Sequence, residues 1–248
     1  MNRREFLKGT AAAGAAAVLM LPSSKKATAL VTPEGKMGRM IPTLTIFDAY
    51  GGFRRQGITA IAGGTGQCKS SYGSYLCALA TFHNPIRTLF LTPFDHSTVL
   101  PASQRILSRK GRRGGCIVHS KVTGWVHPRQ EYLALERIVD DCRPDLIFDD
   151  FGPIDDTRTV KDIHALAFRK NIAYVKTIQT HRTARNDPGF FPAFFGTERL
   201  RWMVNYGMLV TNQLRKSDGE RKLIVRVIKN RYGPSSVGYV VPISALFG

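Results

Sequence analysis

The sequence predicts an α/β domain in which helices flank a mostly parallel, twisted sheet and an antiparallel C-terminal β-hairpin extends that sheet. Between residues 58 and 179, short apolar runs typical of buried strands alternate with segments typical of helices. Near the C-terminus, two further strand-like runs are separated by a Gly-Pro turn. The chain has 248 residues, of which 43% are hydrophobic, which is enough for one large domain or two small ones.

Residues 1–39 are expected to lie outside this domain, which we place at residues 40–248. Residues 2–8 resemble a twin-arginine export motif, and an Ala-rich apolar stretch and a plausible Ala-Thr-Ala cleavage site at residues 27–29 follow it. The segment is therefore interpreted either as an export signal or as an upstream extension of the chain.

The chain carries an excess of positive charge, with 36 Lys and Arg against 18 Asp and Glu and a formal net charge of +18. This excess favours a polyanionic partner, namely nucleic acid, a nucleotide or an anionic lipid, although solubility alone is the alternative explanation. The four cysteines form no C-x-x-C pair, so no zinc site is expected. No run of 18 apolar residues occurs, and we expect no stable insertion into a membrane.

A glycine-rich loop is the central motif, because it stands between an apolar run at residues 58–62 and a predicted helix from Ser70 to about His83. Glycines let the backbone curl around a phosphate, and the positive end of the following helix attracts the anion. Lys69 would reach the β- and γ-phosphates of a nucleotide, and the Ser70 hydroxyl would hold Mg²⁺. The predicted nucleotide-binding residues are Gly63, Gly64, Thr65, Gly66, Gln67, Cys68, Lys69, Ser70 and Ser71.

Cys68 departs from the usual motif, G-x-x-x-x-G-K-[ST], because it stands where the second glycine belongs. A side chain there can crowd the phosphate, and it is strained if the backbone angle φ must be positive. The alternative interpretation is a glycine-rich turn before a helix that binds no nucleotide.

Two carboxylates follow a second buried strand. A predicted helix at residues 128–142 precedes the apolar run of residues 146–148, which ends in Asp149 and Asp150. A parallel strand would deliver Asp149 beside the loop, where it would accept a hydrogen bond from a Mg²⁺-bound water. Asp150 would supply further negative charge that orients water.

Two later groups of residues complete the predicted sheet. A helix from about Thr159 to Lys170 leads into an apolar strand that ends at Gln179, and another apolar run covers residues 204–211. The alternating run of residues 222–228 and the run that ends near Val241 form the C-terminal hairpin.

These motifs, in this order, resemble the RecA-type core of replicative hexameric helicases, the DnaB family, and of the related KaiC-type ATPases. The lead-in from Ile41 to Gly57 carries the family's Asp and Gly-Gly pattern, and the hairpin carries its Lys-Asn-Arg-x-Gly-Pro pattern at residues 229–234. The resemblance covers about residues 41–248 and omits the family's separate N-terminal helical domain.

The resemblance also implies roles for individual residues. The family has a catalytic glutamate after the strand that corresponds to residues 88–92; this sequence has none, and Asp95 is the nearest carboxylate. Gln179 matches the family's polar sensor of the γ-phosphate. Lys229 and Arg231 are two residues apart on one face of a strand, and they would act on the γ-phosphate of a neighbouring subunit. The segment that would face the central channel and bind single-stranded DNA contains Arg182, Arg185 and Arg199.

The resemblance therefore implies a cytoplasmic, ATP- and Mg²⁺-dependent motor that assembles as a ring, expected to be a hexamer, around single-stranded DNA and unwinds DNA during replication. Two alternatives stay open. One is a RecA- or KaiC-like ATPase that binds nucleic acid or protein without unwinding. The other is a degenerate loop protein that binds polyanions without hydrolysis, which Cys68 and the missing glutamate favour. Export by the twin-arginine route is the alternative localisation.

Overall fold

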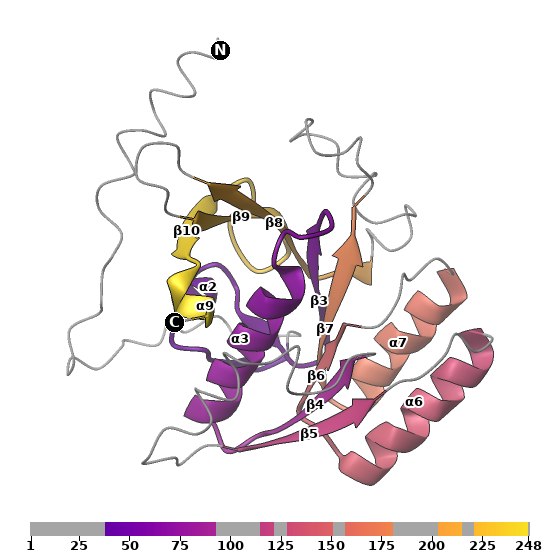
Figure 1. Cartoon of the computed structure of the whole chain (residues 1–248). Coiled ribbons are helices and arrows are strands. Elements are labelled where there is room, and N and C mark those ends of the chain that lie inside the picture. Colours follow the sequence, from indigo (N-terminus) through magenta and orange to yellow (C-terminus); the bar gives the residue numbers. More distant parts are fainter. Residues whose placement is uncertain are drawn as a thin grey trace. The chain divides into compact units, whose positions relative to one another are not determined.

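The computed structural model describes residues 38–92, 115–121, 128–150, 157–180, 203–214 and 221–247. Its centre is an eight-stranded sheet with the strand order β10-β9-β8-β3-β7-β6-β4-β5 (Figure 1). The strands of this sheet are β3 (Gly57–Gly63), β4 (Arg87–Thr92), β5 (Cys116–Lys121), β6 (Leu146–Asp149), β7 (Ala173–Gln179), β8 (Tyr206–Leu214), β9 (Arg221–Asn230) and β10 (Gly238–Pro242). A small second sheet pairs β1 (Met40–Ile41) with β2 (Phe53–Arg54).

The predicted mixture of strand directions is confirmed. Strands β3 to β8 are parallel to one another, whereas β9 and β10 form antiparallel pairs and extend the sheet at one side. Residues 231–237 connect β9 to β10 and contain the predicted Gly-Pro turn. The C-terminal hairpin of the sequence analysis is therefore present.

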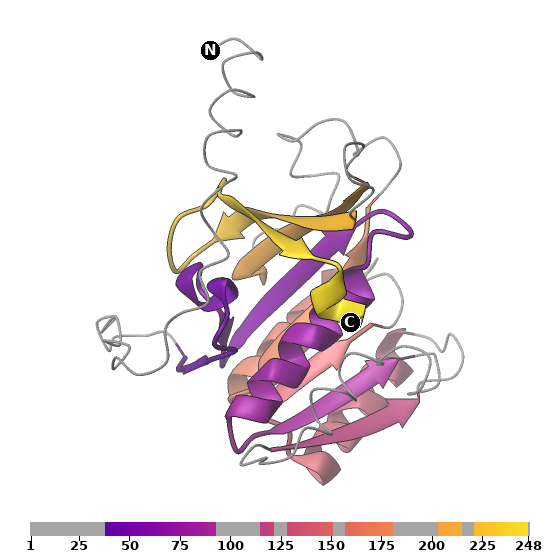
Figure 2. The same cartoon turned by 60° about the vertical axis from the view of Figure 1, so that its left-hand side comes forward.

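Helices cover both faces of the sheet. In Figure 2, α3 (Lys69–His83) crosses the near face, and α6 (Pro128–Cys142) and α7 (Thr157–Arg169) lie behind the sheet. Two short helices complete the described set, α2 (Ile46–Ala49) and α9 (Ser244–Phe247). No helix within the described residues is long and apolar enough to cross a membrane.

The core consists of two apolar clusters, one on each face of the sheet. Leu76 of α3 packs with Phe148 of β6 in the first cluster, and Ile163 of α7 packs with Ile147 of β6 in the second. Consecutive residues of β6 thus enter opposite clusters, as the two-residue period of a strand requires. Helix α3 approaches the sheet closely, because a Cβ atom on Gly73 would lie 2.5 Å from the Phe148 ring.

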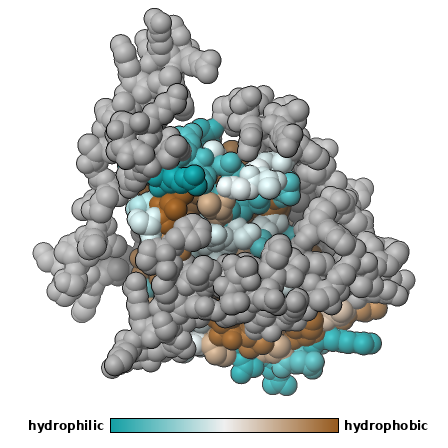
Figure 3. Space-filling model, viewed as in Figure 1, coloured by the Kyte–Doolittle hydropathy of each residue, from teal (hydrophilic) through white to brown (hydrophobic). Residues whose placement is uncertain are grey.

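The outer surface of α6 and α7 is mixed in character. Leu133 of α6 and Phe168 of α7 are exposed, while Arg169 forms an ion pair with Glu136 at 2.9 Å between the two helices. Figure 3 accordingly shows apolar and hydrophilic surface side by side along the lower edge, where Figure 1 places these helices.

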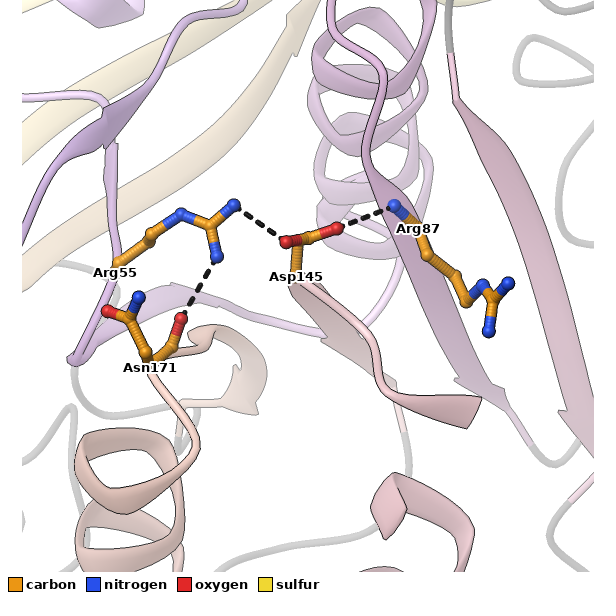
Figure 4. A network of polar contacts seen from close by, with 4 residues as sticks. All are labelled: Arg55, Arg87, Asp145 and Asn171. Carbon is orange, nitrogen blue, oxygen red and sulfur yellow. Dashed lines mark hydrogen bonds and ion pairs between the residues drawn. The ribbon is translucent and has the colours of Figure 1, made fainter. Parts of the chain in front are cut away.

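A polar network joins three segments at the amino edge of the sheet, where the parallel strands begin (Figure 4). The carboxylate of Asp145 accepts a hydrogen bond from the Arg55 guanidinium at 2.7 Å and from the backbone N–H of Arg87 at 2.9 Å. Arg55 also donates to the carbonyl oxygen of Asn171 at 3.1 Å. The network therefore connects the segment before β3, the start of β4 and the turn before β7.

Candidate nucleotide-binding site

The glycine-rich loop joins the end of β3 to the start of α3, at the carboxyl edge of the parallel strands (Figure 1). The Lys69 ammonium donates a hydrogen bond to the carbonyl oxygen of Gly64 at 2.9 Å, and the backbone N–H of Gln67 donates to the same oxygen at 3.3 Å. Lys69 is partly buried and forms no ion pair within the described residues. An anion at the loop would supply this cation with the counter-charge that the described residues do not.

The electrostatic environment of Lys69 reflects its burial. Burial lowers the pKa of Lys69 below its usual range, and the nearby charge of Asp150 acts in the opposite direction. A cation that has lost part of its hydration and faces a helix N-terminus is suited to a multiply charged phosphate group.

Asp150 lies directly against the loop side of the sheet. One oxygen of its carboxylate, Oδ1, accepts hydrogen bonds from the Ser70 hydroxyl at 2.8 Å and from the Thr177 hydroxyl at 2.6 Å. Burial raises the pKa of Asp150 above its usual range, while the hydrogen bonds from Thr177 and Ser70 lower it. The second oxygen, Oδ2, receives no hydrogen bond from the described residues, which leaves it able to accept one from a ligand.

Asp149 lies on the opposite face of the sheet. Its Oδ2 atom accepts hydrogen bonds from the Tyr174 hydroxyl at 2.6 Å and from the Lys176 ammonium at 2.9 Å, and all three side chains are buried. The reason is the two-residue period of β6: Phe148 faces α3, so Asp149 must face α6 and α7, and Asp150 returns to the loop side. The metal-facing role that the sequence analysis assigned to Asp149 therefore passes to Asp150 in the proposal below.

Cys68 occupies a left-handed backbone conformation, with φ 60° and ψ 26°, at the residue that precedes α3. This is the conformation that glycine adopts without strain and that a residue with a Cβ adopts at a cost. Its sulfur atom lies 3.7 Å from the side-chain nitrogen of Asn212, which donates to it. Burial raises the pKa of the Cys68 thiol, and the charges of Arg221 and Lys69 oppose this rise.

Gln179 contacts the loop, at the position where the sequence analysis expected a sensor. Its side-chain amide donates to the Thr65 hydroxyl at 2.8 Å, and the backbone N–H of Thr180 donates to the carbonyl oxygen of Gly63 at 3.1 Å. The segment that begins at residue 181 is thus attached to a residue pair that touches the loop. The predicted residues Asp95, Arg182, Arg185 and Arg199 lie outside the described part of the chain.

Lys229 and Arg231 lie at the amino edge of the sheet, away from the loop of their own chain. Lys229 is paired with Gly207 at the start of β8, and the backbone N–H of Arg231 donates to the carbonyl oxygen of Asn205 at 3.0 Å. The neighbouring Tyr206 is opposite Thr59, four residues before the end of β3. At about 3.3 Å per residue, roughly 13 Å of strand separates this level from the loop.

Three contacts at the site were missed by the sequence analysis. Thr177 holds Asp150, Lys176 holds Asp149, and the backbone N–H of Asn212 donates to the Gln67 side chain at 2.5 Å. The alternation along residues 173–179 contained a signal for the first two, because Lys176 and Thr177 are polar residues inside an otherwise apolar strand. The contact of Asn212 depends on which strand lies beside β3, for which the sequence contains no signal.

Comparisons with known proteins give the fold and one segment. Residues 1–20 match the model of the TAT (twin-arginine translocation) pathway signal sequence, which supports the export interpretation of the N-terminal segment. The crystal structure of the RadB recombinase is similar with a TM-score of 0.60 and 13% identity, over 84% of this chain and 97% of that one. The solved ATPase domain of a helicase is similar with a TM-score of 0.62 and 11% identity, over 85% of this chain and 90% of that one. No curated protein matches the chain. At such identities the likeness establishes the fold alone, which is that of a RecA-like P-loop NTPase.

Proposed function

We propose that this protein binds and hydrolyses Mg²⁺-ATP at the glycine-rich loop and works as a ring-forming motor on single-stranded DNA. The observation that carries the proposal is the meeting of Lys69, Ser70 and Asp150 at the carboxyl edge of the sheet, where α/β folds of this kind bind their ligands. A partly buried cation, a hydroxyl and a carboxylate are the groups that a metal-bound triphosphate requires.

Each residue has a defined task in this proposal. Lys69 would exchange the carbonyl oxygen of Gly64 for the β- and γ-phosphates, and the first N–H groups of α3 would bind phosphate oxygens. Ser70 would hold Mg²⁺ directly and Asp150 would hold it through a bound water, with Thr177 fixing the carboxylate. The metal ion would neutralise the charge that develops on the phosphates. Asp95 stays the proposed group for water activation.

Gln179 would report the state of the nucleotide to the segment that follows it. Its hydrogen bond to Thr65 ties the end of β7 to the loop. Arg182, Arg185 and Arg199 lie in the segment beyond β7, and we propose that they bind the DNA backbone. The net charge of +18 supports a polyanionic partner.

Lys229 and Arg231 would complete the site of a neighbouring copy. They lie at the edge opposite to their own loop, so a role at a γ-phosphate requires a second subunit. This is the basis on which we propose a homo-oligomeric ring, with a hexamer as the expected form. A RecA-like ATPase that binds DNA without unwinding would share every one of these features, and strand displacement separates the two.

A second candidate function is a polyanion-binding protein without ATP turnover. Two observations favour it: the strained Cys68 at the loop, and the match of residues 1–20 to an export signal. An exported protein would reach a compartment without ATP, and the loop would then bind another anion.

The decisive experiment measures ATP hydrolysis by the purified protein with and without single-stranded DNA, together with its mass in solution. We expect DNA-stimulated turnover in an oligomer, and loss of turnover in the Lys69→Ala variant. DNA binding by a monomer without any turnover would contradict the motor and support the second candidate. Arg231→Ala tests the contribution from the neighbour, because full turnover in that variant would exclude it.

A further inference from the structure

Strands β8 and β9 continue past the end of β3 and form a wall beside the glycine-rich loop. The pairing of β3 with β8 ends at Ala62 and Leu209, whereas the ladder between β8 and β9 continues for five more residue pairs, to Leu214 and Arg221. At about 3.3 Å per residue, this part of the wall extends roughly 15 Å. A molecule bound at the loop would therefore have this wall as one of its boundaries.

The wall contacts the loop directly. The backbone N–H of Asn212 donates to the side chain of Gln67, and the side-chain amide of Asn212 donates to the sulfur atom of Cys68 at 3.7 Å. Asn212 is paired with Leu223, two residues along β9 from Arg221. The wall and the loop are thus in register, and Arg221 stands at the outer end of the same contact.

Arg221 emerges on the face of the sheet that carries α3 and the loop. Leu223 and Val225 are buried in the α3-side cluster, and the two-residue period of β9 gives Arg221 the same direction. The side chain of Arg221 is exposed and forms no hydrogen bond or ion pair with the described residues, while its carbonyl oxygen accepts a hydrogen bond from the backbone N–H of Ile243 at 3.3 Å. The pKa of Cys68, which burial raises, is lowered in part by the charge of Arg221, in agreement with this placement.

We propose that Arg221 is a nucleotide-binding residue of the same subunit, whose guanidinium binds the phosphate chain of the nucleotide held by the loop. The guanidinium offers several N–H donors in a plane, a geometry that matches phosphate oxygens. Arg221 thus supplies a cation from the side of the wall, in addition to Lys69 from the loop. The inference rests on the proposed nucleotide site and adds a binding residue that the loop motif does not contain.

The test is an equilibrium titration of the full-length protein with Mg²⁺-ATP and with AMP. Arg221→Gln should weaken ATP binding about tenfold, because a hydrogen bond to a charged group is lost, and should weaken AMP binding less. Arg221→Lys should recover part of the ATP affinity. Arg143→Gln removes another exposed arginine, at the amino edge of the sheet, and should bind ATP as the wild type does.

The outcomes separate this inference from the proposed function. If Arg221→Gln binds ATP as tightly as the wild type while Lys69→Ala does not bind it, the inference is wrong and the nucleotide site stands. If the wild type binds no ATP, the proposed function itself fails. A loss of affinity for a single-stranded oligonucleotide, with unchanged ATP affinity in Arg221→Gln, would overturn the inference in favour of a nucleic-acid contact.

Discussion

The hydroxyl of Ser70 donates a hydrogen bond to the carboxylate of Asp150 at 2.8 Å, which joins the first turn of α3 to the residue after β6. The two residues are 80 positions apart in the sequence. This contact defines which of the two consecutive carboxylates belongs to the loop, and it makes the roles of Asp149 and Asp150 separable by experiment.

Asp150→Asn should lower kcat for ATP hydrolysis by about 100-fold or more, because the neutral amide no longer supports the metal ion. The matched variant is Asp149→Asn, whose side chain lies on the other face of the sheet. It should reduce stability and leave kcat near that of the wild type. Steady-state kinetics at saturating Mg²⁺ measure both variants, and a larger loss of kcat in Asp149→Asn would contradict the assignment.

Lys176→Met should destabilise the protein by about 3–5 kcal/mol, because it leaves the buried carboxylate of Asp149 without its cation. Replacing both partners, as in Lys176→Met with Asp149→Leu, should restore most of that stability, since no buried charge then remains unpaired. Denaturation in urea measures the free energy of unfolding.

The control for this pair is Lys170→Met, which removes an ion pair with Asp140 whose partners are 39% and 53% exposed. Such a surface pair contributes less than about 1 kcal/mol. An equal loss of stability in Lys170→Met and Lys176→Met would show that the buried pair has no special role.

Cys68→Gly should stabilise the protein by about 0.5–1 kcal/mol, because the relief of left-handed strain at this position exceeds the added entropy of glycine in the unfolded chain. We also expect tighter binding of ATP. Cys68→Ala is the matched variant, since it removes the sulfur atom and keeps the Cβ. If alanine raises stability as much as glycine does, strain is not the cause.

Leu44→Gly is an independent test of the same effect at a distance from the loop. Leu44 has φ 59° and is 64% exposed, and its backbone N–H donates to the Asp48 carboxylate at 2.7 Å. Glycine should therefore raise the free energy of unfolding by about 0.5–1 kcal/mol, because little buried area is lost. Leu44→Ala should show no such gain in thermal or urea denaturation.

The pKa of His164 on α7 should lie below its usual value of 6.5, because burial and then the charge of Arg231 disfavour the protonated ring. Since the unfolded chain binds this proton more tightly, the contribution of His164 to stability is present above pH 6.5 and is lost as the pH falls through the folded-state pKa. Arg231→Gln should raise the pKa of His164, which an NMR titration of the ring measures. An unchanged value would separate the two residues.

Much of the fold followed from local patterns. The alternation of strands and helices, the glycine-rich loop and the C-terminal hairpin each depend on a short stretch, and the α/β architecture was confirmed. The directions of Asp149 and Asp150 required one further fact, namely which face of β6 supports α3. Only the contact of Gly73 with Phe148 supplies that fact, because a strand buried on both sides is apolar in both directions.

Contacts between distant strands were beyond the sequence. Thr177 reaches Asp150 because β6 and β7 are neighbours, and Asn212 reaches Gln67 because β8 lies on the other side of β3. Strand order is set by the packing of the whole sheet and leaves no mark in a single stretch of residues. The side chains that support the site were therefore less predictable than the loop itself.

The position of Lys229 and Arg231 at the edge opposite to the loop gives the subunit a head and a tail. A two-fold symmetric dimer places identical surfaces together, so it cannot join one such edge to the other. Only a heterologous, head-to-tail contact does so, and every such contact leaves one unmatched edge at each end of the assembly. The rotation between successive copies then decides whether the assembly closes on itself or grows as an open helical filament.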